Sequence, residues 1–204
     1  MNLPNRLTVS RMLMIPIFMV FAVPFPQWLI EVPVLSALAR NMTEFNGFIL
    51  GTGRWVAGTI FLLAFLTDAL DGYIARKYMM VTDFGKFLDP IADKLLVTAA
   101  MIALVERQEL SSWIAVIIIA REFLVTGIRL LASNQGVVIA AGSLGKLKTV
   151  FQTIALAFML FDNFSIGFLC AVRLDDILMV IALLLTVISG ADYLIKNKHL
   201  IQNR

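Results

Sequence analysis

Long apolar stretches separated by short polar segments dominate the chain, a pattern that predicts membrane-spanning helices. A spanning helix needs about 20 mostly apolar residues. Six windows meet this requirement approximately: 7–26, 54–76, 86–106, 111–132, 145–162 and 174–194. The Gly- and Asn-containing segment 134–145 breaks the pattern once, and a mixed segment, 27–53, links the first two windows. We therefore expect an all-α integral membrane fold with six transmembrane helices.

The composition supports a membrane protein. Apolar residues make up 60% of the 204 residues, and the mean hydropathy of +0.88 is too high for an ordinary soluble domain. We interpret residues 1–204 as a single membrane domain. The N-terminal apolar stretch lacks the small-residue cleavage site of a signal peptide and is long enough to remain as the first span. The lone cysteine, Cys170, cannot form an internal disulfide, and no Cys/His cluster offers a zinc site.

The distribution of Lys and Arg predicts which side of the membrane each segment faces. With six spans, both termini lie on one side. The segments on that side carry Arg6, Arg11, Arg76, Lys77, Lys86, Arg129, Lys146, Lys148, Lys196, Lys198 and Arg204. The opposite segments carry Arg40, Arg54, Arg107 and Arg173 among several acidic residues. The termini and the loop 77–86 are therefore predicted to be cytoplasmic.

Two pairs of aspartates lie near the cytoplasmic ends of neighbouring predicted spans. Asp68 and Asp71 are three residues apart, and Asp89 and Asp93 are four apart, so each pair lies on one helix face. The outer member of each pair lies roughly 10–12 Å below the loop, so both pairs can meet at one depth. Carboxylates within a span are costly unless they are paired or face a wet cavity. This cluster therefore requires a counter-charge.

Divalent metal ions are the counter-charge that suits this cluster best. Lys94 and Arg76 can neutralise two of the carboxylates, but oxygen-only hard ligands are typical of Mg²⁺ and Mn²⁺ sites. Two such ions about 3.5–4 Å apart would also create a site for phosphoryl chemistry. Gly72, Ala75 and Gly85 keep the nearby helix surfaces thin, and Arg76 offers a fork of donors to phosphate oxygens. Singly, each small residue is more often helix-packing material.

The stretch from Asp68 to Asp93 fills every fixed position of the pattern D-x2-D-G-x2-A-R-x8-G-x3-D-x3-D, and so resembles the CDP-alcohol phosphotransferase family. The resemblance implies a homodimer with six transmembrane helices, a pair of divalent metals and a CDP-linked donor. It implies that Asp68, Asp71 and Asp89 are metal ligands and that Asp93 is a ligand or the general base. The residues implied to border the cytidine diphosphate are Asp71, Gly72, Ala75, Arg76 and Gly85. No Ser/His or Cys/His relay lies nearby, which favours direct displacement over a covalent enzyme intermediate.

A set of basic residues lies in the fourth and fifth predicted spans. Arg121 is roughly 12 Å deeper than Arg129 by helix rise, and Lys146 and Lys148 enter the fifth span from the same side. Buried arginines that face a cavity indicate an anionic ligand, here a phosphorylated acceptor alcohol.

Two other interpretations of the basic set stay open. The cations could form internal ion pairs, Arg121 with an aspartate of the acidic cluster, or Glu122 with Lys94 or Arg129. Alternatively, the three residues nearer the cytoplasm could snorkel to anionic lipid heads. These three are Arg129, Lys146 and Lys148.

Three further segments extend the resemblance to one subgroup of the family. NLPNRLTVSR at the N-terminus, AREFLVTGIR in the fourth span and GKLKT in the fifth are similar to bacterial members of the family that transfer a phosphatidyl group from CDP-diacylglycerol to glycerol 3-phosphate. By this resemblance, the acceptor phosphate would bind among Arg121, Arg129, Lys146 and Lys148. The residues implied to close the site from the first helix are Asn5, Thr8 and Arg11.

The resemblance implies a transferase of phospholipid biosynthesis in the inner membrane of a bacterium, with its active site on the cytoplasmic side. Its partners would be the two substrates, membrane lipid and a second copy of the chain; no nucleic acid is expected. Two alternatives remain: a sister enzyme with phosphatidylglycerol, inositol phosphate or serine as acceptor, and a divalent-cation transporter. A transporter would not need the spacing of small residues around Arg76. The segment 27–53, with Trp28, is expected at the membrane surface and is assigned no chemistry.

Overall fold

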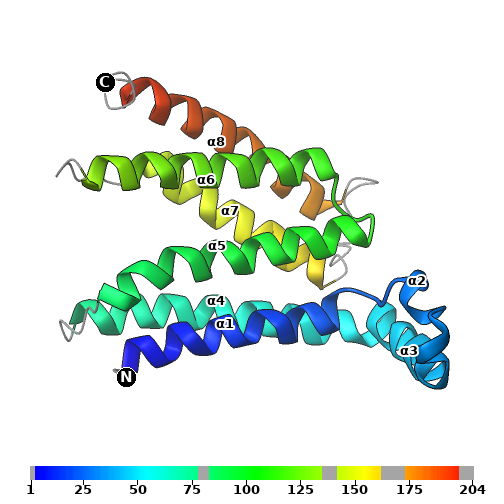
Figure 1. Cartoon of the computed structure of the whole chain (residues 1–204). Coiled ribbons are helices and arrows are strands. Elements are labelled where there is room, and N and C mark those ends of the chain that lie inside the picture. Colours follow the sequence, from blue (N-terminus) through cyan, green and yellow to red (C-terminus); the bar gives the residue numbers. More distant parts are fainter. Residues whose placement is uncertain (1–2, 78–82, 135–141, 162–172, 198–204) are drawn as a thin grey trace. The chain divides into compact units, whose positions relative to one another are not determined.

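The chain folds into two compact helical units (Figure 1). The first contains Met1–Gln108 and Leu160–Asp162, and the second contains Glu109–Met159 and Asn163–Arg204. The computed structural model describes residues 3–77, 83–134, 142–161 and 173–197. Within these ranges, the side chains outside the description are those of residues 3–8, 68–77, 83–90, 93, 133 and 134. All regular elements in the described ranges are helices.

Three long helices form the body of the first unit: α1 (Leu3–Ala22), α4 (Arg54–Lys77) and α5 (Asp83–Glu106). Helix α1 packs against both α4 and α5, which also contact each other. Phe18 of α1 and Phe61 of α4 are fully buried, with ring centroids 6.3 Å apart. Small side chains let such helices approach closely. The buried alanines of α4 and α5 are Ala57, Ala64, Ala92, Ala99, Ala100 and Ala103.

The direction of α1 follows from a contact at its C-terminal end. Arg107 lies directly after α5, and its Nη1 donates a hydrogen bond of 3.4 Å to the carbonyl oxygen of Ala22, the last residue of α1. A cation at a helix C-terminus satisfies a carbonyl that has no partner within the helix. The first turn of α1 consequently lies at the same end of the unit as the last turn of α4 and the first turn of α5 (Figure 1).

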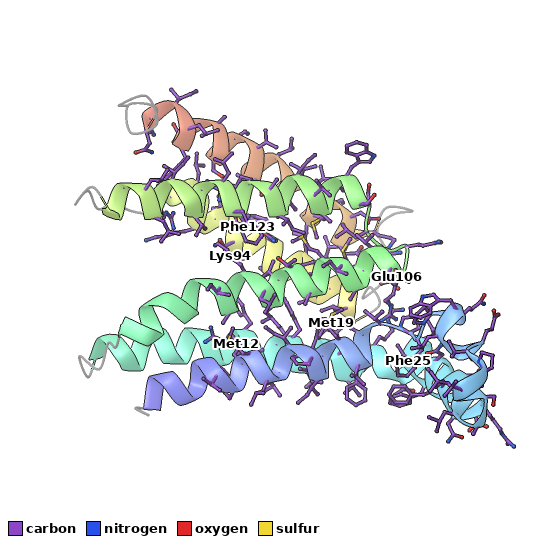
Figure 2. The ribbon with its side chains drawn as sticks, in the orientation of Figure 1. Met12, Met19, Phe25, Lys94, Glu106 and Phe123 are labelled. Atoms are coloured by element: carbon purple, nitrogen blue, oxygen red, sulfur yellow. The ribbon has the colours of Figure 1, made fainter. Side chains whose placement is uncertain are left out.

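The segment between α1 and α4 is mostly helical. Its elements are α2 (Gln27–Ile30), the 3₁₀ turn η1 (Pro33–Leu35), α3 (Ser36–Phe48) and the π-helical turn η2 (Ile49–Gly53). The side chain of Asn46 holds the backbone of Phe25, accepting from its N–H at 2.7 Å and donating to its carbonyl at 2.9 Å. Phe25 lies in an aromatic cluster at the end of the unit opposite the first turn of α1 (Figure 2). The cluster consists of Phe21, Phe25, Phe45 and Phe48.

The second unit is built from α6 (Ser112–Asn134), α7 (Ser143–Leu160, whose last residue belongs to the first unit) and α8 (Leu174–Lys196). Helices α6 and α8 pack against each other. Towards the C-terminal ends of these two helices the packing consists of a small apolar cluster. Its residues are Val125, Ile128, Tyr193 and Leu194.

Apolar side chains are also exposed on the outer helix faces. On α8, Leu184, Val187 and Ile188 are each more than half exposed, which is typical of helices whose solvent is lipid. Among the described residues, two helical segments, Pro33–Thr67 and Leu174–Lys196, are long and apolar enough to cross a membrane. The six windows predicted from the sequence overlap six long helices, which are α1, α4, α5, α6, α7 and α8.

Candidate functional site

The two aspartate pairs lie on α4 and α5, which contact each other. Each pair is at a similar distance along its helix from the end where α4 leads into α5. The backbone is helical at all four positions, so the spacings of three and four residues put each pair on one helix face. Asp71 and Asp68 lie six and nine residues before the end of α4, and Asp89 and Asp93 lie six and ten after the start of α5. At the rise of an α-helix these positions are roughly 9–15 Å from the connected helix ends. The four carboxylates themselves lie outside the described side chains.

The positions expected to border the donor nucleotide lie near the same helix ends. Gly72, Ala75 and Arg76 occupy the last two turns of α4, and Gly85 occupies the first turn of α5. Their side-chain environments lie outside the described residues. The helical backbone preserves the spacing that the sequence motif prescribes.

The first turns of α1 lie at this end of the first unit (Figure 1). Arg11 is almost fully buried, with 1% of its surface exposed. Thr8 lies about one turn and Asn5 about two turns before it, and their side chains are outside the described residues. The three positions that the sequence assigned to the first helix are therefore on the expected end of α1.

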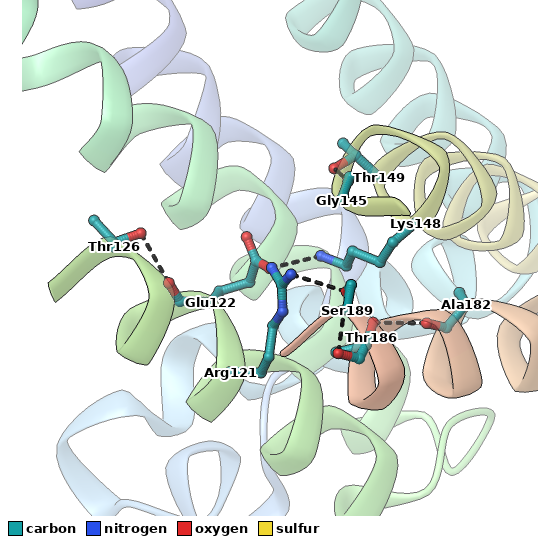
Figure 3. A network of polar contacts seen from close by, with 9 residues as sticks. All are labelled: Arg121, Glu122, Thr126, Gly145, Lys148, Thr149, Ala182, Thr186 and Ser189. Atoms are coloured by element: carbon teal, nitrogen blue, oxygen red, sulfur yellow. Dashed lines mark hydrogen bonds and ion pairs between the residues drawn. The ribbon is translucent and has the colours of Figure 1, made fainter. Parts of the chain in front are cut away.

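A polar network joins the three helices of the second unit (Figure 3). Glu122 Oε1 accepts a hydrogen bond of 2.9 Å from Arg121 Nη1 and one of 2.8 Å from Lys148 Nζ. Arg121 Nη2 donates a further bond of 2.9 Å to Ser189 Oγ. Helix α6 thus contributes Arg121 and Glu122, α7 contributes Lys148, and α8 contributes Ser189. The network fixes the position of Arg121 with contacts on two of its nitrogens.

The three charged side chains described in this network are two cations and one carboxylate. Lys148 is only 3% exposed and Arg121 15%, and the single carboxylate of Glu122 faces both cations. Buried ion pairs are stable only where hydrogen bonds replace the lost hydration. Two cations and one carboxylate leave a net charge of +1 among these three side chains. An anion bound here would form charge-assisted hydrogen bonds, which are the strong ones.

The other two predicted acceptor-binding residues are outside the network drawn in Figure 3. Arg129, two turns further along α6, is exposed, and its guanidinium carbon lies 5.7 Å from the centroid of the Tyr193 ring. Lys146 is exposed in the first turn of α7. The structure therefore groups Arg121 with Lys148. Glu122 forms internal ion pairs with Arg121 and Lys148, a pairing that was not among those considered from the sequence.

Two residues in this region were not predicted from the sequence. Ser189 accepts the hydrogen bond from Arg121, and Gly190 follows it in the buried face of α8. The signal was present as a Ser-Gly pair that interrupts an otherwise apolar helix. Polar and small residues in such helices more often serve helix packing, so the pair does not stand out before its contacts are known.

A second ion pair lies at the start of α8. Arg173 Nη2 donates to Oδ2 of the fully buried Asp175 at 3.0 Å, and Oδ1 of the same carboxylate accepts from the backbone N–H of Asp176. The hydrogen bond to Asp175 is the main reason that the pKa of Arg173 is raised above its usual value. An acid in the first turn also stabilises the helix N-terminus, so this pair has a structural explanation.

Comparison with known proteins identifies the family. Residues 1–188 match the CDP-alcohol phosphatidyltransferase family. The chain belongs to this family. The resemblance of the aspartate motif is thereby confirmed, and members of the family generally use a divalent metal. The four aspartate positions fit such an ion by their chemistry, because they offer only hard oxygen donors.

Relatives of the family align with nearly the whole chain. The CDP-diacylglycerol–glycerol-3-phosphate 3-phosphatidyltransferase of Bacillus subtilis is 43% identical over 198 residues, which cover 96% of this chain and 95% of the relative. The protein of the same name from Rickettsia typhi is 35% identical, with 94% of each chain covered. A probable phosphatidylglycerophosphate synthase of Mycobacterium tuberculosis is 38% identical over 94% of this chain and 79% of its own.

Proposed function

We propose that this family member transfers a phosphatidyl group from CDP-diacylglycerol to glycerol 3-phosphate, which yields phosphatidylglycerophosphate and CMP. The observation that carries the proposal is the likeness, over nearly the whole chain, to relatives named for this transfer. The basic network of the second unit supports it, because the excess positive charge around Arg121 and Lys148 suits an acceptor that carries a phosphate.

The aspartates of α4 and α5 form the metal and donor part of the proposed site. Asp68, Asp71 and Asp89 hold the divalent metal, Mg²⁺ or Mn²⁺, with two ions expected. When bound, the metal neutralises the donor diphosphate and the charge that develops on departing CMP. The residues that border the cytidine diphosphate in this proposal are Asp71, Gly72, Ala75, Arg76 and Gly85.

Asp93 is proposed as the general base, besides contributing to the metal site. Its carboxylate accepts the proton of the glycerol 3-phosphate hydroxyl as that oxygen attacks the phosphorus that bears the diacylglycerol. The bond from this phosphorus to the CMP oxygen breaks, and CMP leaves with the electron pair. A carboxylate kept ionised by adjacent cations is suited to this role.

The acceptor phosphate is proposed to bind among Arg121, Arg129, Lys146 and Lys148. Arg121 offers a planar fork that matches phosphate oxygens, and Lys148 supplies a buried point charge. Glu122 holds these two cations in place before the acceptor binds. Asn5, Thr8 and Arg11 are proposed to contribute to the site from α1.

The proposed setting is the inner membrane of a bacterium. The six long helices span it as one domain, with both termini and the active site on the cytoplasmic side. The excess of Lys and Arg in the segments assigned to that side supports the orientation. The segment with Trp28 lies at the opposite membrane surface, where this indole is 70% exposed. The active form is proposed to be a homodimer.

The direct test is release of CMP by the purified protein in detergent. CDP-diacylglycerol and Mg²⁺ or Mn²⁺ are supplied with one acceptor at a time: glycerol 3-phosphate, inositol phosphate, serine or phosphatidylglycerol. We expect release with glycerol 3-phosphate alone. Release with another acceptor would keep the aspartate assignments and overturn the acceptor, whereas no release with any acceptor, together with metal uptake into protein-loaded vesicles, would favour a transporter.

A further inference from the structure

Two neighbouring residues of α8 enclose the side chain of Arg121. Ser189 Oγ accepts the 2.9 Å hydrogen bond from Arg121 Nη2 and lies 3.3 Å from the carbonyl oxygen of Thr186, to which it can donate. Gly190 lies against the aliphatic part of the same arginine. A Cβ atom at Gly190 would lie 3.0 Å from Arg121 Cγ, closer than nearly all real Cβ contacts. Ser189 therefore holds the guanidinium, and Gly190 makes room for the stem.

The Nε edge of the guanidinium also lies beside Gly190, with no side chain of that residue next to it. The same imagined Cβ would lie 3.5 Å from Arg121 Nε. That nitrogen is buried and has no hydrogen-bond partner among the described residues, while Nη1 and Nη2 are bound to Glu122 and Ser189. Buried donors without partners are rare in native proteins and require an explanation. A phosphate oxygen on this edge would supply the missing acceptor.

We infer that Ser189 and Gly190 are positioning residues for the acceptor phosphate, acting through Arg121. This inference rests on the proposed function, because it assumes that Arg121 binds the phosphate of glycerol 3-phosphate. Ser189 fixes the rotation of the guanidinium plane, and Gly190 keeps a side chain from occupying the space beside Nε. Together they give α8 control over acceptor affinity, although neither residue touches the substrate in this scheme.

A purely structural role would have different consequences. If Gly190 only allowed α6 and α8 to pack closely, a methyl group there would reduce stability and affect both substrates alike. If it positions Arg121, the methyl group shifts one binding group for one substrate. Loss of ground-state binding to a single substrate raises the KM for that substrate and leaves kcat nearly unchanged.

The test compares Gly190→Ala with a matched control, Gly127→Ala. Gly127 lies on α6, the helix that carries Arg121, and a Cβ there would meet nothing within 4 Å. For Gly190→Ala we expect the KM for glycerol 3-phosphate to rise about tenfold, because small displacements of a binding group are costly. The KM for CDP-diacylglycerol and kcat should stay within about twofold, as should all constants of Gly127→Ala.

Ser189→Ala provides a second variant that adds no bulk, and it decides the matter if Gly190→Ala does not fold. Removing the acceptor of one charge-assisted hydrogen bond should raise the KM for glycerol 3-phosphate roughly three- to tenfold. Equal changes for both substrates, or no change in either variant, would overturn the positioning role. Absence of turnover with glycerol 3-phosphate in the unsubstituted protein would instead overturn the proposed function, so the two failures are distinguishable.

Discussion

The two units carry opposite kinds of charge in their long helices. In the first, the four aspartate positions lie on two consecutive helices, and in the proposed function a bound metal balances their negative charge. In the second, Glu122 is balanced by Arg121 and Lys148, which come from two helices and leave a small positive excess. The acidic part should therefore depend on a bound metal, whereas the basic part is assembled before its ligand arrives.

This difference separates two kinds of catalytic contribution. A preassembled cationic network needs little reorganisation when an anion binds, which favours affinity and orientation of the acceptor. In the proposed function, an acidic cluster completed by metal would act on the reacting phosphoryl group itself. Damage to the acidic part should therefore reduce turnover, and damage to the basic part should mainly raise the KM for the acceptor.

Removal of the metal should have the largest effect. A chelator should abolish CMP release, since the carboxylates alone would repel the donor diphosphate. Mg²⁺ or Mn²⁺ added in excess should restore it. The measurement is CMP release before chelation, after it and after readdition. Full activity in the presence of the chelator would contradict a metal-completed site.

Asp93→Asn should have the second-largest effect on activity. The amide keeps the shape of the side chain but cannot take a proton, so kcat should fall by about 10²–10⁴-fold, the usual contribution of general acid–base catalysis. Asp83→Asn is the matched control, because Asp83 begins α5 outside the motif, and its kcat should stay within about threefold. Normal kcat in a folded Asp93→Asn protein would remove the base assignment.

These two parts of the site differed in how far the sequence could predict them. The aspartates lie on two helices that follow each other closely in the chain, so local spacing alone predicts their shared depth, and the predicted windows coincide with these long helices. The network around Arg121 joins residues 121, 148 and 189 from three helices. No local pattern encodes such a meeting, because it depends on how helices pack. Arg121 and Lys148 could accordingly be predicted from their charge, whereas Ser189 and Gly190, which carry no charge, could not.

Lys148→Met should have an intermediate effect. It removes the buried cation and its bond to Glu122, so the KM for glycerol 3-phosphate should rise roughly tenfold to a hundredfold with a smaller change in kcat. Lys146→Met is the control two residues earlier on α7, where the side chain is exposed. The measurement is steady-state kinetics of both variants, with the concentration of each substrate varied in turn. A larger effect at Lys146 than at Lys148 would contradict the importance of the buried network.

Arg129→Gln should have the smallest effect and decides between two roles for an exposed cation. Arg129 lies over the Tyr193 ring near the end of α6, where it could assist the acceptor phosphate or interact with anionic lipid heads. If it serves the acceptor, the KM for glycerol 3-phosphate should rise about threefold, because a solvated cation contributes little. The rise in KM relative to the unsubstituted protein should then be the same in neutral and in anionic vesicles. A rise in KM that occurs only in anionic vesicles would assign Arg129 to the membrane surface. Acceptor binding would then depend on the buried pair, Arg121 and Lys148.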